Sequence, residues 1–152
     1  MPPEPAVTEA ASHRPRPRRS LLFVPALRPD RFLKALDTGA DIVCIDMEDA
    51  VALDRKDEGR AATLPLFRTR THPHVEQMVR INGLSTYHGL KDLQALIECE
   101  APPDAIMIPK IRSAEEVQLI DTLLAAGPAR AIRFCVIIET NQGLERALDI
   151  AR

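Results

Sequence analysis

The chain has 152 residues, of which 45% are hydrophobic, so it is long enough for one domain with a substantial core. Its net charge of -2 excludes an overall basic footprint for nucleic acid, and 3% aromatic residues with no Trp argue against a base-stacking surface. No window approaches the ~20 apolar residues of a membrane span, and none has the form of a signal peptide. We therefore expect a cytoplasmic protein that acts on small molecules and has no nucleic-acid or membrane partner.

The first 18 residues differ from the rest in composition. They are rich in Pro and Arg and lack apolar periodicity, so they cannot bury enough surface to offset the entropy cost of ordering. We expect residues 1–18 to form a disordered tail and residues 19–152 to form the folded domain. The basic cluster at its end could bind an anionic partner, but a solvated leader is the favoured interpretation.

From Ser20 onward, short apolar runs alternate with longer segments of helical period. The predicted strands are 21–26, 41–46, 77–81, 105–109 and 134–139. The predicted helical segments are 29–39, 54–67, 89–99, 113–127 and 141–151. Because the strands are too apolar to leave one face in water, the pattern predicts a parallel sheet covered by helices.

Cysteine and histidine give no metal-binding pattern. The three cysteines have no C-x-x-C spacing, and two of them lie inside apolar runs, which is typical of small buried side chains in a reducing compartment. They are Cys44, Cys99 and Cys135. Three histidines in or beside connecting segments are expected at the surface. They are His72, His74 and His88.

Charged side chains follow four of the five predicted strands. They are Asp46, Glu48 and Asp49 after the second strand, Arg80 at the third, Lys110 after the fourth and Glu139 at the fifth. Because the carboxyl ends of parallel strands gather at one face, these groups should meet there. Carboxylate oxygens suit Mg²⁺, and Arg binds a carboxylate bidentately, so the pattern indicates a site for a metal and an acidic substrate.

The same segments carry a family resemblance. "RSLLFVPALRPDRFLKALDTGADIVCIDMEDAVALDRK", "VRINGLSTYHGLKDL", "AIMIPKIRSAEEV" and "VIIETNQGLERALDIA" together resemble the HpcH/HpaI aldolase and citrate lyase β-subunit superfamily, in its citrate lyase β-like and malyl-CoA lyase branch. The resemblance covers residues 19 to 152. It implies a (β/α)₈ barrel of the TIM type that binds Mg²⁺, with Mn²⁺ as a possible substitute.

The resemblance also assigns roles within the acidic and basic cluster. Glu139 matches a metal-ligand glutamate, and Arg80 matches the arginine that binds the acid or carbonyl oxygens of the substrate. Glu48 and Asp49 match an acidic pair that hydrogen-bonds metal-bound waters. Lys110 fits a supporting role, paired with Glu48.

A looser part of the resemblance concerns coenzyme A. Phe23, Arg28 and Lys34 occupy positions similar to the CoA-contacting residues of malyl-CoA lyases. The family pattern Pro-Gly after the first strand is replaced here by Pro25-Ala26, which puts close backbone approach of a ligand there in doubt.

The length is the larger departure from the family. An eightfold barrel needs ~250 residues, and this sequence contains only about the first five βα units. The family's second metal-ligand aspartate, at the end of the sixth strand, has no counterpart. Relatives are homo-oligomers, trimers or hexamers, so a homo-oligomer is expected, and an open sheet would favour association at its unpaired edge.

The expected activity is that of a Mg²⁺-dependent carbon-carbon lyase acting on a malyl-CoA, citramalyl-CoA or citryl-CoA type substrate. Two enzymatic alternatives on the same barrel are an acyl-CoA thioesterase and a CoA-independent 2-keto acid aldolase. A third is a catalytically incomplete fragment that serves only for oligomerisation or interaction. Two structural interpretations also stay open: Asp46 as a strand-end hydrogen-bonding residue, and Arg80 as an ion pair that merely satisfies Glu48 or Asp49.

Overall fold

A computed structural model describes residues 17–125 and 127–152, which contain one five-stranded parallel sheet. The strands are β1 (Leu21–Pro25), β2 (Ile42–Asp46), β3 (Glu76–Arg80), β4 (Ala105–Ile108) and β5 (Arg133–Val136). They lie in the order β1-β2-β3-β4-β5, so every strand pairs with its neighbour in the sequence. Such sequential parallel order is that of successive units in a βα barrel.

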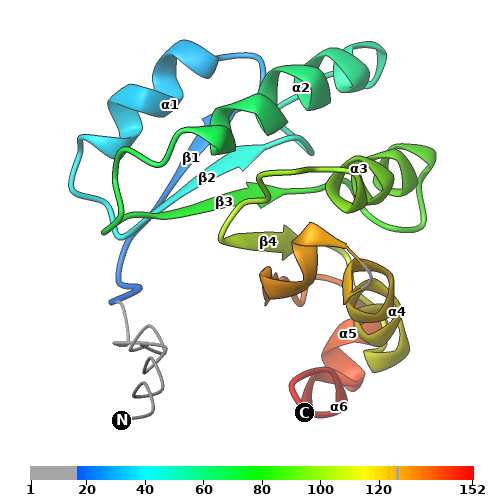
Figure 1. Cartoon of the computed structure of the whole chain (residues 1–152). Coiled ribbons are helices and arrows are strands. Elements are labelled where there is room, and N and C mark those ends of the chain that lie inside the picture. Colours follow the sequence, from blue (N-terminus) through cyan, green and yellow to red (C-terminus); the bar gives the residue numbers. More distant parts are fainter. Residues whose placement is uncertain (1–16, 126) are drawn as a thin grey trace, which may run out of the picture.

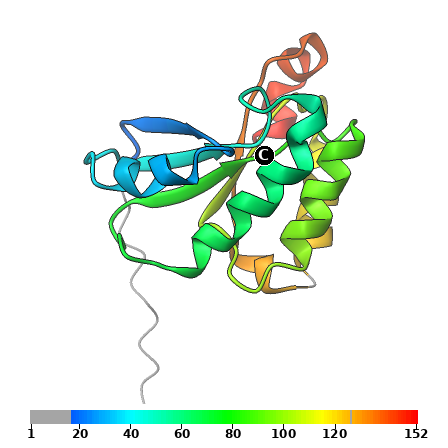
Figure 2. The ribbon, with the colours of Figure 1, turned by 90° about the horizontal axis from the view of Figure 1, so that it is seen from above.

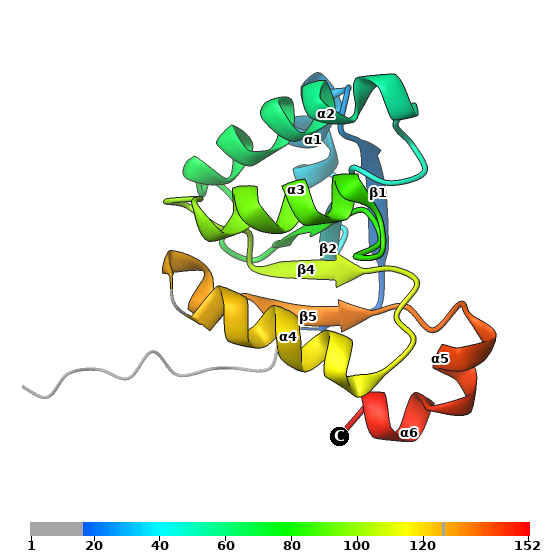
Figure 3. The same ribbon diagram turned by 90° about the vertical axis from the view of Figure 1, so that its right-hand side faces the viewer.

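The helices between the strands cover one side of this sheet (Figures 1 and 3). They are α1 (Pro29–Leu36), α2 (Lys56–Thr63), α3 (Tyr87–Ile97) and α4 (Ala114–Ala125). Seen from above, α2 and α3 run side by side as neighbouring helices (Figure 2). The short helices α5 (Asn141–Glu145) and α6 (Ala147–Ile150) lie beyond the arrowheads of β4 and β5 (Figure 3).

Local sequence explains where the helices begin and end. Pro29 stands in the first turn of α1, where its missing N–H costs nothing, and Gly39 takes a φ of 80° just after the helix, a conformation that glycine adopts without strain. At the start of α3 the side chain of Thr86 accepts a hydrogen bond from the Gly89 amide. Thr140 caps α5 in the same way, through Gly143.

The two faces of the sheet bury different residues. The helix-facing side forms the main core, in which strand residues such as Val43, Val79 and Ile106 pack with Phe32 and Leu96 from the helices. A smaller cluster occupies the opposite face, which we call the inner face. It consists of Ile42, Cys44, Met78, Ala105 and Met107. Alternation of side chains along each strand therefore separates a helix-packed core from the inner face.

The structure confirms the predicted alternation of strands and helices and changes some bounds. The predicted segment 54–67 contains α2 between two 3₁₀ turns, η1 (Leu53–Arg55) and η2 (Leu64–Arg68). The last predicted helix is divided at Arg146, whose φ of -111° and ψ of 15° are not helical. β5 ends at Val136, so Glu139 lies in the connection after the strand.

Two further expectations concern the tail and the membrane. Of the predicted tail, residues 1–16 lie outside the described part; Arg18 is described and forms an ion pair with Glu76 of β3. Within residues 17–125 and 127–152, no helix is long and apolar enough to cross a membrane.

Candidate active site at the carboxyl ends of the strands

The centre of the site is a pair of side chains on neighbouring strands. Asp46 is the last residue of β2 and Arg80 the last of β3, and the parallel register places them opposite each other. Arg80 donates from Nε and Nη2 to the two oxygens of Asp46 at 2.8 and 2.6 Å. This bidentate geometry fixes the guanidinium at the end of the sheet.

Asp46 also organises the turn that follows β2. Its carboxylate accepts hydrogen bonds from the backbone amides of Glu48 and Ala50, at 2.8 and 3.1 Å. Burial alone would raise the pKa of Asp46, but the hydrogen bonds from Arg80 and from these amides lower it below its usual value. The contacts agree with the structural role predicted for Asp46.

Glu48 lies between two cations. Its Oε1 is 2.8 Å from Lys110 Nζ, and its Oε2 is 3.3 Å from Arg80 Nη1. Both oxygens are buried, and neither accepts a hydrogen bond of good geometry from the described residues. Glu48 therefore keeps acceptor capacity that the protein itself leaves unused. The expected pairing of Lys110 with Glu48 is present.

Lys110 links Glu48 to the fifth strand. Its backbone has a φ of 57°, an uncommon conformation for a residue other than glycine. In this conformation its amide donates to Glu139 Oε1 at 3.0 Å while its side chain reaches Glu48. Contact with Glu48 raises the pKa of Lys110 above its usual value, so the ammonium form is favoured. Lys110 thus connects the predicted metal ligand with the predicted acidic pair.

Two other expected residues lie beside Arg80. Asp49 Oδ2 is 3.4 Å from Arg80 Nη1, and its side chain is 68% exposed. The Arg80 guanidinium carbon lies 5.2 Å from the centre of the Phe23 ring, a cation–π arrangement that leaves Phe23 45% exposed. The end of β1 therefore contributes an accessible aromatic ring to the same site.

The structure does not bring every expected residue into this cluster. Arg28 is exposed and pairs with Asp30 at the start of α1. Lys34 is exposed in the last turn of α1, and within the described residues no acidic group lies within 4.0 Å of its ammonium. Their expected contact with coenzyme A stays a prediction.

The charge balance of the cluster is negative. Among the described residues, four carboxylates, Asp46, Glu48, Asp49 and Glu139, lie around Arg80 and Lys110. Among residues 17–125 and 127–152, no group of three or more His, Cys, Asp or Glu side chains is arranged to hold a metal ion. Mg²⁺ needs fewer protein ligands than such a group provides, because it keeps several waters and is often held by one or two carboxylates together with substrate oxygens. The carboxylates at the strand ends fit this cation.

Three residues that the sequence did not single out support this cluster from behind. Lys56, Asn82 and Asp92 are all buried. A sequence signal existed for Asp92, because it lies on the face of α3 that also carries Gly89 and Leu96, both buried, where a carboxylate needs a partner. Lys56 is one of many charged residues in its segment, so its burial had no such signal.

The histidines lie apart from the cluster. His72 contacts Asp37 at 2.9 Å, and His74 is exposed. His88 is half-buried, and its Nδ1 is buried without a hydrogen-bond partner in the described residues.

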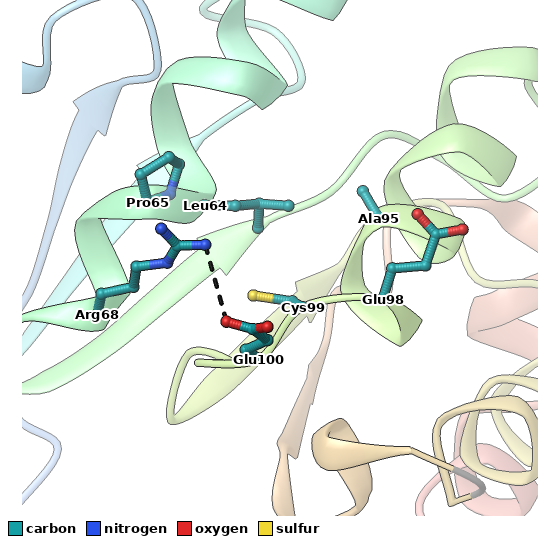
Figure 4. Close-up of a pocket in the computed structure, with 7 residues that line it drawn as sticks. All are labelled: Leu64, Pro65, Arg68, Ala95, Glu98, Cys99 and Glu100. Carbon is teal, nitrogen blue, oxygen red and sulfur yellow. Dashed lines mark ion pairs between the residues drawn. The ribbon is translucent and has the colours of Figure 1, made fainter.

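A pocket also lies away from the cluster, between η2 and the end of α3 (Figure 4). An ion pair between Arg68 and Glu100, at 4.0 Å, crosses it, and Cys99 contributes to its wall. Because η2 precedes β3 and the end of α3 precedes β4, this pocket belongs to the amino ends of the strands. None of the expected site residues lines it.

Known proteins resemble this chain over most of its length. It is 36% identical to a (3S)-malyl-CoA thioesterase of Cereibacter sphaeroides over 140 residues, which are 92% of this chain and 47% of the relative. It is 37% identical over 142 residues to an L-malyl-CoA/beta-methylmalyl-CoA lyase of the same species, covering 90% of this chain and 45% of the lyase. The chain thus spans about half the length of these relatives.

A solved structure also has a fold similar to that of this chain. Protein CitE of Mycobacterium tuberculosis, in complex with magnesium and pyruvate, superposes with a TM-score of 0.68 and 34% identity over 88% of this chain and 51% of CitE. The family profile described as HpcH/HpaI aldolase/citrate lyase matches residues 19–152. The chain therefore belongs to the HpcH/HpaI aldolase/citrate lyase family.

Proposed function

We propose that the chain contributes the first part of a Mg²⁺-dependent carbon-carbon lyase site for a short acyl-CoA such as malyl-CoA or citramalyl-CoA. The observation that carries the proposal is the cluster at the strand ends, in which four carboxylates surround Arg80 and Lys110. A divalent cation would offset the excess negative charge of this cluster. Both malyl-CoA relatives and the magnesium complex of CitE support this choice.

Each residue has a role in this proposal. Glu139 is exposed and would supply a carboxylate oxygen to the cation, while Glu48 and Asp49 would accept hydrogen bonds from its waters. Mg²⁺, when bound, would act as a Lewis acid on a substrate oxygen, and Mn²⁺ is the expected substitute.

Arg80 would bind the negative end of the substrate. Its Nε and Nη2 are engaged by Asp46, whereas Nη1 approaches Glu48 and Asp49 only at 3.3 and 3.4 Å. Nη1 therefore has N–H donors that would serve a carboxylate or carbonyl oxygen of the substrate while the bidentate pair stays intact. Because the guanidinium is already fixed, little reorganisation is needed when negative charge develops on that oxygen.

The reaction requires such stabilisation. In cleavage of malyl-CoA, the hydroxyl group loses a proton, the carbon-carbon bond breaks, glyoxylate is released, and the electron pair passes to the enolate of acetyl-CoA. The enolate then takes up a proton. Arg80 would stabilise the oxygen of the α-hydroxy acid, and the exposed ring of Phe23 would pack against an apolar part of the thioester.

A thioesterase is the second candidate, because one relative at 36% identity bears that name. The two reactions differ in products: the lyase releases acetyl-CoA and glyoxylate, and the thioesterase releases malate and free CoA. Both would use the same binding groups.

The test is product analysis with the purified chain, malyl-CoA or citramalyl-CoA, and Mg²⁺. We expect acetyl-CoA with glyoxylate or pyruvate, and loss of product in Arg80→Met and Glu139→Gln. Free CoA without a keto acid would favour the thioesterase. No product, under conditions in which a malyl-CoA lyase is active, would contradict lyase activity of this chain and favour the catalytically incomplete fragment.

A further inference from the structure

Behind the Glu48 turn lies a group of polar side chains that no proposed role has used. They come from α2, from the segment after β3 and from α3, and we call them the buried polar network. Its members are Lys56, Arg60, Asn82 and Asp92, each with less than one tenth of its surface exposed. Burying four such groups is unfavourable unless their hydrogen bonds are satisfied, so their partners indicate what they do.

Lys56 contacts the main chain of the site. Its ammonium donates to the carbonyl oxygen of Met47, at 2.9 Å, and to that of Glu48. The amide nitrogen of the Asn82 side chain donates to the same Met47 carbonyl, at 3.1 Å. The consecutive main-chain carbonyls of Met47 and Glu48 are therefore both held by side chains of the buried polar network.

The rest of the network fixes Asn82. Asp92 Oδ2 accepts from the backbone amide of Asn82 at 2.8 Å and from its side-chain nitrogen at 2.7 Å. The other oxygen of Asp92 accepts from Arg60 Nε at 2.7 Å. Asn82 is thus oriented on both sides, and its remaining N–H can only point to Met47.

The positive charge of Lys56 also interacts with nearby carboxylates. Burial lowers the pKa of Lys56, while the nearby carboxylates of Asp46, Asp92 and Glu48 act in the opposite direction. No acidic oxygen of the described residues lies within 4.0 Å of its ammonium. A neutral donor could bind the carbonyls at lower cost, but the ammonium also offsets the mutual repulsion of the carboxylates at the strand ends.

We infer that Lys56 is a positioning residue, which, with Asn82 and Asp92, holds the Met47 and Glu48 carbonyls so that the Glu48 carboxylate stays between Arg80 and Lys110. The inference deepens the proposed function, on which the role of Glu48 rests. Lys56 touches neither substrate nor cation; it acts through Glu48.

The first readout is amide hydrogen exchange, measured by NMR on the full chain. The amides of Glu48 and Ala50 report on the turn because both donate to Asp46. In Lys56→Met we expect both to exchange about tenfold faster, since the Met47 and Glu48 carbonyls lose their contacts with the Lys56 ammonium. The Ile137 amide, bonded to Ile108 in the sheet, should keep its rate.

Two further variants distinguish a loss of the Lys56 contacts from a general loss of stability. Lys56→Gln keeps a donor without the charge and should restore part of the protection, and it serves as the test if Lys56→Met does not fold. Lys91→Met is the matched control, because it makes the same change at a lysine whose exposed partner Asp57 also contacts Arg60, so it alters the edge of the network but not the Met47 and Glu48 carbonyls. It should leave the Glu48 and Ala50 amides unchanged. Unaltered exchange in both Lys56 variants would overturn the inference.

The second readout is Mn²⁺ affinity, measured by electron paramagnetic resonance. Removal of a buried positive charge near four carboxylates should strengthen Mn²⁺ binding by Coulomb attraction alone. If Lys56 instead positions Glu48, the Lys56→Met variant should bind Mn²⁺ about fivefold more weakly. Stronger Mn²⁺ binding in this variant would contradict a positioning role. If the unmodified chain binds no Mn²⁺, the metal part of the proposed function fails, and the exchange rates still decide whether Lys56 holds the turn.

Discussion

Both ends of the inner face of the sheet carry glutamate and arginine, yet the two ends differ in charge balance. At the amino ends, the buried Glu76 meets two arginines, Arg18 at 3.1 Å and Arg133 at 3.6 Å. At the carboxyl ends, four carboxylates share Arg80 and Lys110. Cations are in excess at one end and carboxylates at the other.

This difference teaches that ion pairing alone does not distinguish a functional cluster. Glu76 pairs with two arginines of the described residues and so connects the start of β3 to the segment before β1 and to the start of β5. Among the described residues, both buried oxygens of Glu48 lack a hydrogen-bond partner, whereas only one oxygen of Glu76 does, and carboxylates outnumber the cations Arg80 and Lys110 around Glu48. An excess of carboxylates at strand ends favours a further cation, and on this property we base the proposal that the site lies at the carboxyl end.

The largest expected effect separates the two ends by their arginines. Arg80→Met leaves Asp46 and Glu48 buried without their guanidinium partner and should lower the free energy of unfolding by about 3–5 kcal/mol. Arg133→Met should cost less than about 1 kcal/mol, because Arg133 is 46% exposed and Arg18 still binds Glu76. Urea unfolding followed by circular dichroism measures both. Equal losses would break the comparison.

A smaller effect is expected from the two glutamates. Glu76→Gln removes a carboxylate that Arg18 and Arg133 share and should destabilise the fold by about 1–3 kcal/mol. Glu48→Gln relieves repulsion within an acidic cluster and should change stability by less than about 1 kcal/mol while weakening Mn²⁺ binding. The pair of variants is compared by urea unfolding and Mn²⁺ titration. A reversed order of stability would show that charge balance does not govern the two ends.

The smallest effect concerns pH. The folded-state pKa of Asp46 is below its usual value, so its contribution to stability is present above pH ~4 and is lost as pH falls through the depressed pKa. In Arg80→Met the main group that lowers this pKa is gone and burial raises it, so acid should destabilise the variant less than the unmodified chain. Urea midpoints between pH 7 and pH 3 measure the difference. Parallel pH profiles of the unmodified chain and Arg80→Met would contradict the claim that Arg80 lowers the pKa of Asp46.

The sequence predicted much of this arrangement. Apolar runs of strand length and helical periods were sufficient for the sequential parallel sheet, because side chains buried on both faces leave few other solutions. The same logic placed Asp46, Arg80 and Lys110 at one end of the sheet, and the family resemblance implied the pairing of Lys110 with Glu48.

Tertiary contacts account for what the sequence did not predict. The bidentate contact of Arg80 goes to Asp46, because cross-strand register sets the partner and the pattern alone left Glu48 and Asp49 as candidates. The carbonyl contacts of Lys56 depend on the path of the turn after β2, which composition does not encode. The last helix is divided at Arg146, and no Pro or Gly stands at the break itself to predict it from the sequence.

The most direct test of the account is a Mn²⁺ titration of the full chain followed by electron paramagnetic resonance, with Mg²⁺ as competitor. We predict a single displaceable site that is weakened at least tenfold by Glu139→Gln and left unchanged by Glu76→Gln at the other end of the sheet. Equal binding by the unmodified chain and Glu139→Gln, or no binding at all, would contradict the claim that the carboxyl-end cluster is a divalent cation site.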